Sequence, residues 1–265
     1  MADIQRPIGV FDSGVGGLGI LKEAYTRLSN EDFLYYADMG NAPYGDKSDA
    51  QICRLMDSAL AWFFPRDIKA LVIACNTATA AAVDYLREKY PDLPTISTEP
   101  AVKPAFESAP QGKILVMATP STLKFARYRQ LAEKYGGADV IAVPCTGLAT
   151  LVETDGPASA AVHTYLANKL APFSGMALRG VVLGCTHYNY LCADIRCVLG
   201  DVAIFDGTLG TTLRLVDVLE EKKLLRAEKG PHTLEFFITG EAPVGERGRE
   251  LLASFWRITP PQESL

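Results

Sequence analysis

The sequence predicts an α/β protein made of two related domains, each built around a parallel sheet. Short apolar runs alternate with amphipathic stretches, which is the βαβ pattern. The apolar runs are continuous rather than alternating, as expected of strands that are buried on both faces. Similar segments recur about 110 residues apart. A chain of 265 residues, 48% of them hydrophobic, is long enough to form two such cores.

The individual elements follow from these patterns in chain order. Amphipathic stretches at 48–64 and 121–135 are predicted to be helices. The C-terminal sequences HTLEFFITG and GERGRELLASFW indicate one added strand and a closing helix. Seven apolar runs are predicted to be buried parallel strands: 8–11, 33–37, 71–74, 114–118, 140–143, 181–184 and 202–205.

The internal repeat indicates how the domains divide. LVIACNTATA at 71–80 resembles VVLGCTHYNY at 181–190, and the two cysteines are 185 − 75 = 110 residues apart. IGVFDSG and ILVMATP align at an offset of 114 − 8 = 106. We expect residues 1–97 and 210–265 to form an N-terminal domain, and 98–209 to form a C-terminal domain. The active site is expected in the cleft between them.

Composition excludes several classes of function. The net charge is −5 and basic residues form no block, which argues against nucleic acid or an anionic membrane as a partner. No apolar run approaches the ~20 residues that span a bilayer. The first residues, MADIQRPIGVFDSG, lack the basic start and apolar run of a signal peptide, so we expect a cytoplasmic protein.

The six cysteines are therefore expected to be reduced. They form no CxxC pair, and only Cys185 and His187 are close enough in sequence to suggest joint ligation. Structural zinc needs four ligands, usually in short paired spacings, so no metal is expected. Four cysteines are interpreted as packing residues: Cys53, Cys145, Cys192 and Cys197.

Polar residues follow five of the predicted strands. In open parallel sheets, ligands bind beyond the carboxyl ends of the strands, so these segments are the candidate site. They are FDSGVGG (11–17), YADMGNAPYG (36–45), ACNTAT (74–79), ATPST (118–122) and GCTHY (184–188).

The first of these segments allows three interpretations. Gly14, Gly16 and Gly19 match GxGxxG, and Asp38 ends the next strand, as in a nicotinamide-dependent oxidoreductase. However, Asp12 precedes the glycines, and a carboxylate beside a pyrophosphate is electrostatically unfavourable. The glycines could simply form a tight turn. We favour a site for a small ligand's carboxylate, bound by backbone amides at a helix N-terminus.

The two strand-end cysteines point to a specific chemistry. A single cysteine in such a place is usually a small buried hydrophobe. Here Cys75 and Cys185 occupy matching places, precede predicted helices and are followed by hydrogen-bonding residues. A helix N-terminus favours a thiolate over the resting thiol pKa of ~8.5. Two thiols facing one ligand could remove a proton from one face of a carbon and deliver one to the other, which is racemisation.

On these residues the chain resembles the glutamate racemase family, within the aspartate/glutamate racemase superfamily. The combination of FDSGVGGL, CNTAT and GCTHY is the most specific part of the resemblance. Further resembling segments are YYADMGNAPYGDKS (35–48), EPAVKPA (99–105) and LVETDG (151–156).

The resemblance implies a role for each site residue. Cys75 and Cys185 are the implied catalytic acid/bases, acting on the D- and L-enantiomer respectively. Asp12 and His187 are expected to assist the thiols, with Glu153 near the second one. The remaining implied substrate-binding residues are Ser13, Tyr44, Gly45, Asn76, Thr77, Thr119, Thr122 and Thr186; Asp12 and His187 are also included in that set.

The resemblance also implies a wider setting. It indicates interconversion of L- and D-glutamate without a cofactor, a role in supplying D-glutamate for peptidoglycan, and a homodimer. No sequence motif indicates a Schiff-base lysine for pyridoxal phosphate. Three alternatives stay open on the sequence: an aspartate racemase, a nicotinamide-dependent oxidoreductase, and an amino-acid-binding protein without catalytic activity.

Overall fold

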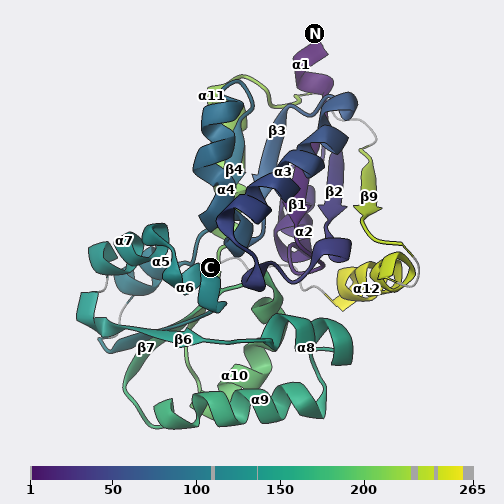
Figure 1. The fold of residues 1–265 in the computed structure, drawn as a ribbon. Helices are drawn as coiled ribbons and strands as arrows, with labels where there is room; N and C mark the ends of the chain where they lie inside the picture. The colour runs from purple at the N-terminus through teal and green to yellow at the C-terminus, as the bar shows by residue number, and fades with distance from the viewer. Residues whose placement is uncertain (1, 109–110, 136, 228–231, 242–243, 259–265) are drawn as a thin grey trace. The chain divides into compact units, whose positions relative to one another are not determined.

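The computed structural model describes residues 2–108, 111–135, 137–227, 232–241 and 244–258. The chain forms two compact units. Unit 1 comprises Met1–Thr98 and Thr208–Leu265, and unit 2 comprises Glu99–Gly207. The chain therefore leaves unit 1 once and returns to it at helix α11 (Figure 1).

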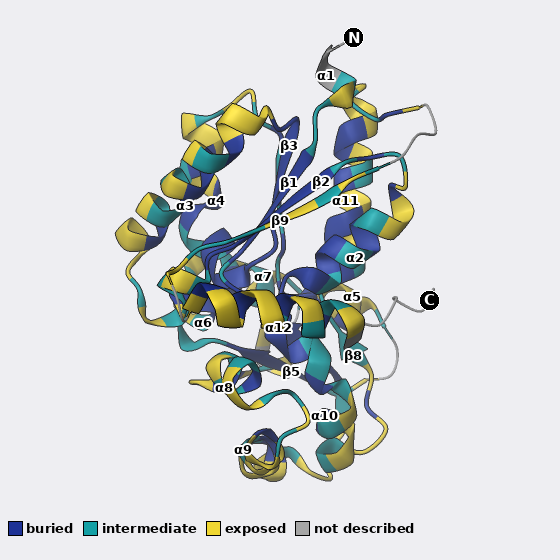
Figure 2. Cartoon of the chain, turned by 90° about the vertical axis from the view of Figure 1, so that its right-hand side faces the viewer, coloured by how far each residue is buried: buried dark blue, intermediate teal, exposed yellow. Residues whose placement is uncertain are grey.

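Unit 1 has a five-stranded sheet in which every neighbouring pair is parallel. Helices α3 and α4 cover one face, and α2 and α11 cover the other (Figure 2). The strands in spatial order are β4 (Thr95–Ser97), β3 (Ala70–Ile73), β1 (Ile8–Asp12), β2 (Phe33–Ala37) and β9 (Leu234–Ile238).

The other elements of unit 1 connect and flank this sheet. The α-helices are α1 (Ala2–Gln5), α2 (Leu18–Arg27), α3 (Asp49–Phe63), α4 (Asn76–Lys89), α11 (Thr208–Glu221) and α12 (Val244–Ile258). The 3₁₀ segments are η1 (Met39–Asn41), η2 (Tyr44–Asp46) and η3 (Phe64–Arg66).

Unit 2 has a four-stranded parallel sheet with helices on both faces. The strands in spatial order are β6 (Val140–Pro144), β5 (Lys113–Ala118), β7 (Leu178–Gly184) and β8 (Ile204–Phe205). The helices are α5 (Val102–Glu107), α6 (Pro120–Lys124), α7 (Ala126–Tyr135), α8 (Leu148–Asp155), α9 (Ala160–Leu170) and α10 (Cys192–Leu199). The 3₁₀ segments are η4 (Gly137–Asp139), η5 (Ala171–Phe173) and η6 (Thr186–Leu191).

The two sheets share one strand order. Unit 1 reads β4-β3-β1-β2 before the added β9, and unit 2 reads β8-β7-β5-β6 in the same sense. Strands β1 to β4 of unit 1 therefore correspond, in order, to β5 to β8 of unit 2. This confirms the predicted fold class of two parallel-sheet α/β sets with a repeated topology.

The core of unit 1 shows why these residues form strands. Phe11, Leu34, Tyr36, Leu71 and Ile73 pack in one buried cluster with apolar side chains of α3 and α4. Leu34 and Tyr36 on β2, and Leu71 and Ile73 on β3, are two residues apart, which is the period at which side chains reach the same face of a sheet. The intervening residues are also buried, so both faces of β1, β2 and β3 are covered and the runs read as continuously apolar.

Three elements differ from the sequence prediction. Strand β4 has three residues, too short to give a hydrophobic pattern. The predicted helix at 121–135 is broken at Phe125, whose φ of −67° and ψ of 141° are extended. The run at 202–205 pairs with β7 only at Ile204 and Phe205, so it is a strand for two residues.

Among the residues that the structure describes, no helix combines the length and apolar character that a membrane crossing requires.

Candidate functional site: two strand-end thiol clusters

Each sheet has a topological switch point, where the chain changes direction across the sheet. In unit 1 it lies between β1 and β3, and in unit 2 between β5 and β7. Ligands of open α/β sheets bind beyond the carboxyl ends of the strands at such points. Cys75 follows β3 and Cys185 follows β7, so each thiol lies at the switch point of its own sheet.

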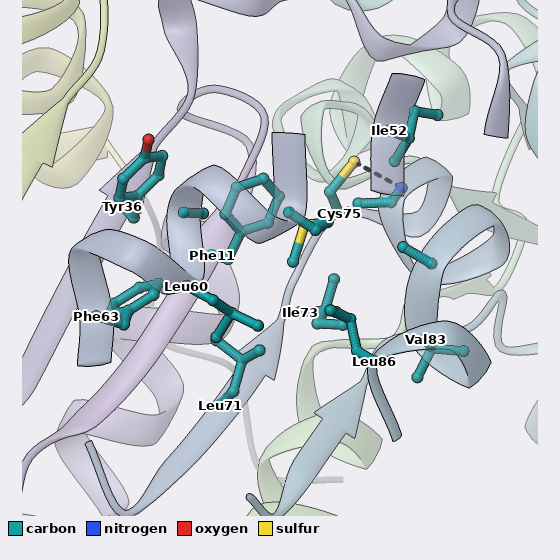
Figure 3. Close-up of a cluster of buried hydrophobic side chains, with 14 of the residues drawn as sticks. Phe11, Tyr36, Ile52, Leu60, Phe63, Leu71, Ile73, Cys75, Val83 and Leu86 are labelled. Carbon is teal, nitrogen blue, oxygen red and sulfur yellow. Dashed lines mark hydrogen bonds between the residues drawn. The ribbon is translucent and has the colours of Figure 1, made fainter. Parts of the chain in front are cut away.

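In unit 1 the thiol is held between two donors. Cys75 is the N-cap of α4, and its Sγ accepts from the backbone N–H of Ala78 at 3.4 Å. Ser13 Oγ donates to the same sulfur at 3.4 Å. Figure 3 shows Cys75 at the edge of the buried cluster beside Phe11 and Ile73, with its sulfur directed at a backbone nitrogen. Both donors and the helix N-terminus favour a thiolate here.

Asp12 is fixed at the end of the neighbouring strand. It is the last residue of β1 and is fully buried. Its Oδ1 accepts from the N–H of Gly14 at 2.8 Å, and the Tyr35 hydroxyl donates to the carbonyl of Gly14 at 2.9 Å. A Cβ at Gly17 would lie 2.8 Å from the Asp12 Cβ, so the turn requires glycine at this position. Asp12 therefore has a defined orientation on the same strand end as Ser13.

The first turn of α4 adds a polar group that its protein neighbours do not saturate. Asn76 and Thr77 are both buried. Asn76 Oδ1 has no hydrogen-bond partner among the described residues. A buried acceptor without a partner is costly, and a bound ligand that donates a hydrogen bond would remove that cost.

The Tyr44 side chain is turned into the core rather than outward. It packs against Phe11, with ring centroids 6.0 Å apart, and belongs to the same buried cluster as Cys75. Its hydroxyl donates to Asp38 Oδ2 at 2.5 Å. Burial, and then the Asp38 carboxylate, raise the pKa of Tyr44 far above its usual value. The Tyr44 hydroxyl is therefore engaged within the protein.

Asp38 was the acid that a dinucleotide interpretation would place on a ribose. The structure gives it a different environment, because both of its carboxylate oxygens accept from protein groups. Oδ1 accepts from Asn41 Nδ2 at 2.9 Å and from Thr239 Oγ1 at 2.6 Å, while Oδ2 accepts from Tyr44. The side chain is buried, so it acts within the protein rather than on a ribose hydroxyl.

In unit 2 the thiol has an imidazole partner instead of a helix amide. Cys185 Sγ lies 3.8 Å from His187 Nδ1, and His187 Nε2 lies 2.7 Å from Glu153 Oε1 on α8. Cys185 precedes η6, its side chain makes no capping bond, and α10 begins only at Cys192. The helix predicted directly after Cys185 is therefore a 3₁₀ segment at its start.

The buried imidazole is held in its protonated form. Burial acts to lower the pKa of His187, but the Glu153 carboxylate and Cys185 outweigh it and raise that pKa well above its usual value. An imidazolium donates from both ring nitrogens, to Glu153 on one side and to the sulfur on the other. The cluster Cys185–His187–Glu153 can therefore stabilise a thiolate by a charge-assisted hydrogen bond.

The hydroxyl residues of unit 2 lie on the same edge. Ala118 pairs with Gly184, so Thr119 comes beside Cys185 as Ser13 does beside Cys75. Ser13 and Thr119 are 119 − 13 = 106 residues apart, the offset of the sequence repeat. Thr119 caps α6 through the N–H of Thr122 and also donates to its hydroxyl at 3.0 Å. Thr186 follows the thiol and is buried.

Two residues beside Cys185 received no site role from the sequence. Tyr188 is fully buried, and its hydroxyl donates to the carbonyl of Cys145 at 3.1 Å. Burial, and then the charge of Cys185, raise the pKa of Tyr188 well above its usual value. Burial likewise raises the pKa of Cys145 to about 12, which keeps that thiol protonated. The sequence signal for Tyr188 was its place in GCTHY, four residues past an apolar strand.

The two thiols follow counterpart strands of their sheets, but different groups interact with their sulfur atoms. Cys75 has backbone and hydroxyl donors, whereas Cys185 has an imidazolium backed by a carboxylate. All six cysteines lie in the described ranges, and none of them forms a disulfide. Within those ranges, no group of three or more His, Cys, Asp and Glu side chains is arranged to hold a metal ion. The chemistry that these side chains offer is proton transfer by thiols.

Comparisons with known proteins agree with this chemistry. The family model for Asp/Glu/Hydantoin racemase matches residues 39–212. A glutamate racemase of Clostridium novyi is 44% identical over 235 residues, which is 88% of this chain and 91% of the relative.

Solved structures give the same result. The glutamate racemase of Francisella tularensis, crystallised with D-glutamate, is 32% identical with a TM-score of 0.80, over 94% of both chains. The Escherichia coli glutamate racemase, crystallised with L-glutamate and the activator UDP-MurNAc-Ala, is 27% identical with a TM-score of 0.82, over 94% of this chain and 95% of that one. The chain belongs to the Asp/Glu/Hydantoin racemase family and, within it, to the glutamate racemases, which are isomerases.

Proposed function

We propose that this protein interconverts L- and D-glutamate by a two-base mechanism in which Cys75 and Cys185 act on the same Cα atom. The observation that carries the proposal is the equivalent placement of two thiols at the switch points of two sheets with one strand order. The mechanism requires both thiol clusters to act on a single substrate molecule. Glutamate is the substrate named for the Francisella and Escherichia coli relatives.

The proton transfers balance within one turnover. One cysteine, as a thiolate, takes the Cα proton and becomes a thiol, leaving a planar carbanion. The other cysteine, as a thiol, gives its proton to the opposite face and becomes a thiolate. By family analogy, Cys185 is the base toward L-glutamate and Cys75 the base toward D-glutamate. Each group thus works in both protonation states.

The substrate's charges match groups already in place. Deprotonation adds negative charge beside an ionised carboxylate, and that charge needs fixed donors. Ser13, Thr77 and Thr186 supply hydroxyls, and the first turn of α4 supplies backbone N–H groups. Asn76 Oδ1 and the Asp12 carboxylate are acceptors suited to the ammonium group. The remaining proposed contacts come from the Tyr44–Gly45 backbone, Thr119, Thr122 and His187.

The proposal extends to the cellular setting. D-Glutamate made in the cytoplasm would supply peptidoglycan synthesis, and the enzyme would act as a homodimer without a cofactor. Light scattering of the purified protein tests the dimer. Growth of a strain that lacks the gene, with and without added D-glutamate, tests the supply role.

The direct test of the activity is a chiral assay of the purified protein without added cofactor. We expect L-glutamate and D-glutamate each to give a racemic mixture, and L-aspartate to be converted far more slowly. In D₂O, the product enantiomer should carry deuterium at Cα while the remaining substrate carries little, because the proton donor differs from the proton acceptor. Equal labelling of both pools from the start would point to one base, and tight NAD binding without turnover would favour an oxidoreductase.

Replacing Glu153, the carboxylate of the cluster Cys185–His187–Glu153, should change how turnover depends on pH. Glu153→Gln removes the carboxylate that most strongly raises the pKa of His187, so the imidazolium should lose its proton at a lower pH. We expect kcat/KM for L-glutamate to fall by about tenfold at mildly alkaline pH, the equivalent of one pKa unit. The alkaline limb of the pH profile should move toward neutral pH.

The raised pKa of His187 also makes the free energy of unfolding depend on pH. Because the folded-state pKa of His187 is raised, its contribution is complete below the unfolded value of ~6.5 and is lost as pH rises through the higher folded value. Asp155→Asn is the matched control, since it removes an equal charge from an exposed position of the same helix. If both variants show the same pH profile, Glu153 does not act through His187.

A further inference from the structure

The segment that carries Tyr44–Gly45 is held by the C-terminal part of the chain. Thr239 directly follows β9, and its Oγ1 donates to Asp38 Oδ1 at 2.6 Å. Thr239 Oγ1 also accepts from the N–H of Gly40 at 2.9 Å. One hydroxyl therefore bonds both the carboxylate and the backbone of the loop after β2, and these residues are separated by about 200 positions in sequence.

Backbone packing adds to this hydroxyl contact. A Cβ at Gly40 would lie 2.9 Å from the Cα of Gly240, so the two backbones meet too closely for any side chain at residue 40. A Cβ at Gly248 of α12 would lie 3.4 Å from Met39 Cγ, so α12 also packs on η1. The position of η1 is thus set by Thr239 and Gly240 after β9 and by α12.

Asp38 transmits this restraint to η2. It is 1% exposed, and its second oxygen accepts from the Tyr44 hydroxyl. The Tyr44 ring packs against Phe11 in the cluster that includes Cys75, and η2 lies against α4, the helix that Cys75 caps. Asp38 therefore joins Thr239 to Tyr44 through its two carboxylate oxygens. Hydrogen bonds to a buried carboxylate are among the stronger neutral-donor bonds in proteins.

We infer that Asp38 and Thr239 are positioning residues, which set the Tyr44–Gly45 backbone for binding the substrate's carboxylate. The inference rests on the proposed substrate-binding role of Tyr44–Gly45. It assigns β9, Thr239, Gly240 and α12 a part in substrate binding, although none of these residues belongs to the thiol clusters. A loop that is not held in its binding conformation binds more weakly, because ordering it then has to accompany substrate binding.

The fold contains its own control for this inference. Thr233 directly precedes β9, and its hydroxyl donates to Asp32 Oδ1 at 2.8 Å, where Asp32 directly precedes β2. Thr239 and Asp38 make the same kind of bond at the other end of the same strand pair. The first bond lies at the amino ends of the strands and the second at the carboxyl ends, so only the second is near Cys75.

The experiment compares Thr239→Val with Thr233→Val. Both should lower the melting temperature, Thr239→Val more than Thr233→Val, because the Thr239 hydroxyl makes two hydrogen bonds, one of them to the buried Asp38, whereas the Thr233 hydroxyl makes an exposed bond to Asp32. Thr239→Val is expected to raise KM for glutamate about threefold to tenfold, the range of one lost hydrogen bond, with little change in kcat. Thr233→Val should keep the wild-type KM. Thr239→Ser, which retains the hydroxyl, should restore KM.

A double variant tests the route through Asp38. If Thr239 acts through Asp38 on Tyr44, the rise in KM of Thr239→Val with Tyr44→Phe should be smaller than the product of the single effects. Equal KM values in Thr239→Val and Thr233→Val, with glutamate racemised normally, would overturn the positioning role alone. Absence of glutamate racemisation in the wild-type protein would overturn the proposed function, and this inference with it.

Discussion

Replacing either Cys75 or Cys185 by serine is expected to reduce racemisation of glutamate by at least about 10³-fold, because a hydroxyl does not provide an anionic base near neutral pH as a thiol does. The loss should be of kcat rather than KM, since neither thiol is needed to hold the ammonium or the carboxylates. Circular dichroism and melting temperature should stay close to wild type, because serine is slightly smaller and fits both sites.

The two variants should differ in the enantiomer of glutamate whose Cα proton they still exchange with solvent. With Cys185→Ser, the remaining thiol still faces the D-enantiomer, so deuterium exchange at Cα in D₂O should persist for D-glutamate and be lost for L-glutamate. Cys75→Ser should show the opposite preference. Such enantiomer-specific exchange without racemisation separates loss of one base from loss of the whole site. It can be measured by mass spectrometry after chiral separation.

The remaining thiols provide matched controls. Cys192→Ser changes a thiol of unit 2 that donates to the carbonyl of Asn189 and whose pKa burial raises to about 11. Cys53→Ser changes a thiol of unit 1 that bonds the carbonyl of Ala81. Both should keep near-wild-type turnover. Near-native racemisation in Cys75→Ser or Cys185→Ser would contradict the two-base mechanism.

The central strands could be predicted because both of their faces are buried. Every residue of β1, β2 and β3 is buried, which gives an uninterrupted apolar run bounded by polar residues. The edge strands β4 and β8 have three and two residues, and such short runs carry no period. The repeat was visible because Cys75 and Cys185 follow counterpart strands in sheets of the same order.

The sequence predicts which strand ends carry the candidate site, but most of the distant residues that contact them come from the fold. Ser13 and Cys75 are recognised from the sequence because each comes at the end of an apolar run, and the structure shows that β1 and β3 are neighbours. The contacts that orient the site come from distant parts of the chain. Glu153 reaches His187 from 34 residues away, and Thr239 reaches Asp38 from 201 residues away. No local pattern encodes such pairs: the family resemblance placed Glu153 near Cys185, whereas the partner of Asp38 required the fold.

The buried Lys69 is a further contact that sequence reasoning did not find. It directly precedes β3, and none of its side chain is exposed. Its ammonium group donates to Glu31, to the carbonyl of Ile4 at 2.8 Å and to the carbonyl of Leu224 at 2.9 Å. All three donors of the ammonium are therefore used. The other oxygen of Glu31 accepts from the N–H of Arg226 at 2.8 Å.

This ionic cluster joins three separate parts of unit 1 at the amino ends of its strands. Ile4 belongs to α1, Glu31 precedes β2, and Leu224 follows α11 in the segment that returns from unit 2. Burial lowers the pKa of Lys69, and the hydrogen bond to Glu31 counteracts that shift. The position is at the opposite strand ends from Cys75, so the cluster should influence folding and not turnover.

Lys69→Met is expected to destabilise the protein by about 3–5 kcal/mol, because it leaves the Glu31 carboxylate buried without its counter-charge. The melting temperature should fall by on the order of 10 °C. Adding Glu31→Gln to Lys69→Met should recover part of the loss, since the unpaired charge is then absent. Lys89→Met, which removes a surface ion pair with Asp57, should change stability little. Scanning calorimetry gives the melting temperatures. Turnover of the folded variants at low temperature should match wild type. If the Lys69→Met protein were as stable as Lys89→Met, the cluster would not hold the returning segment in place.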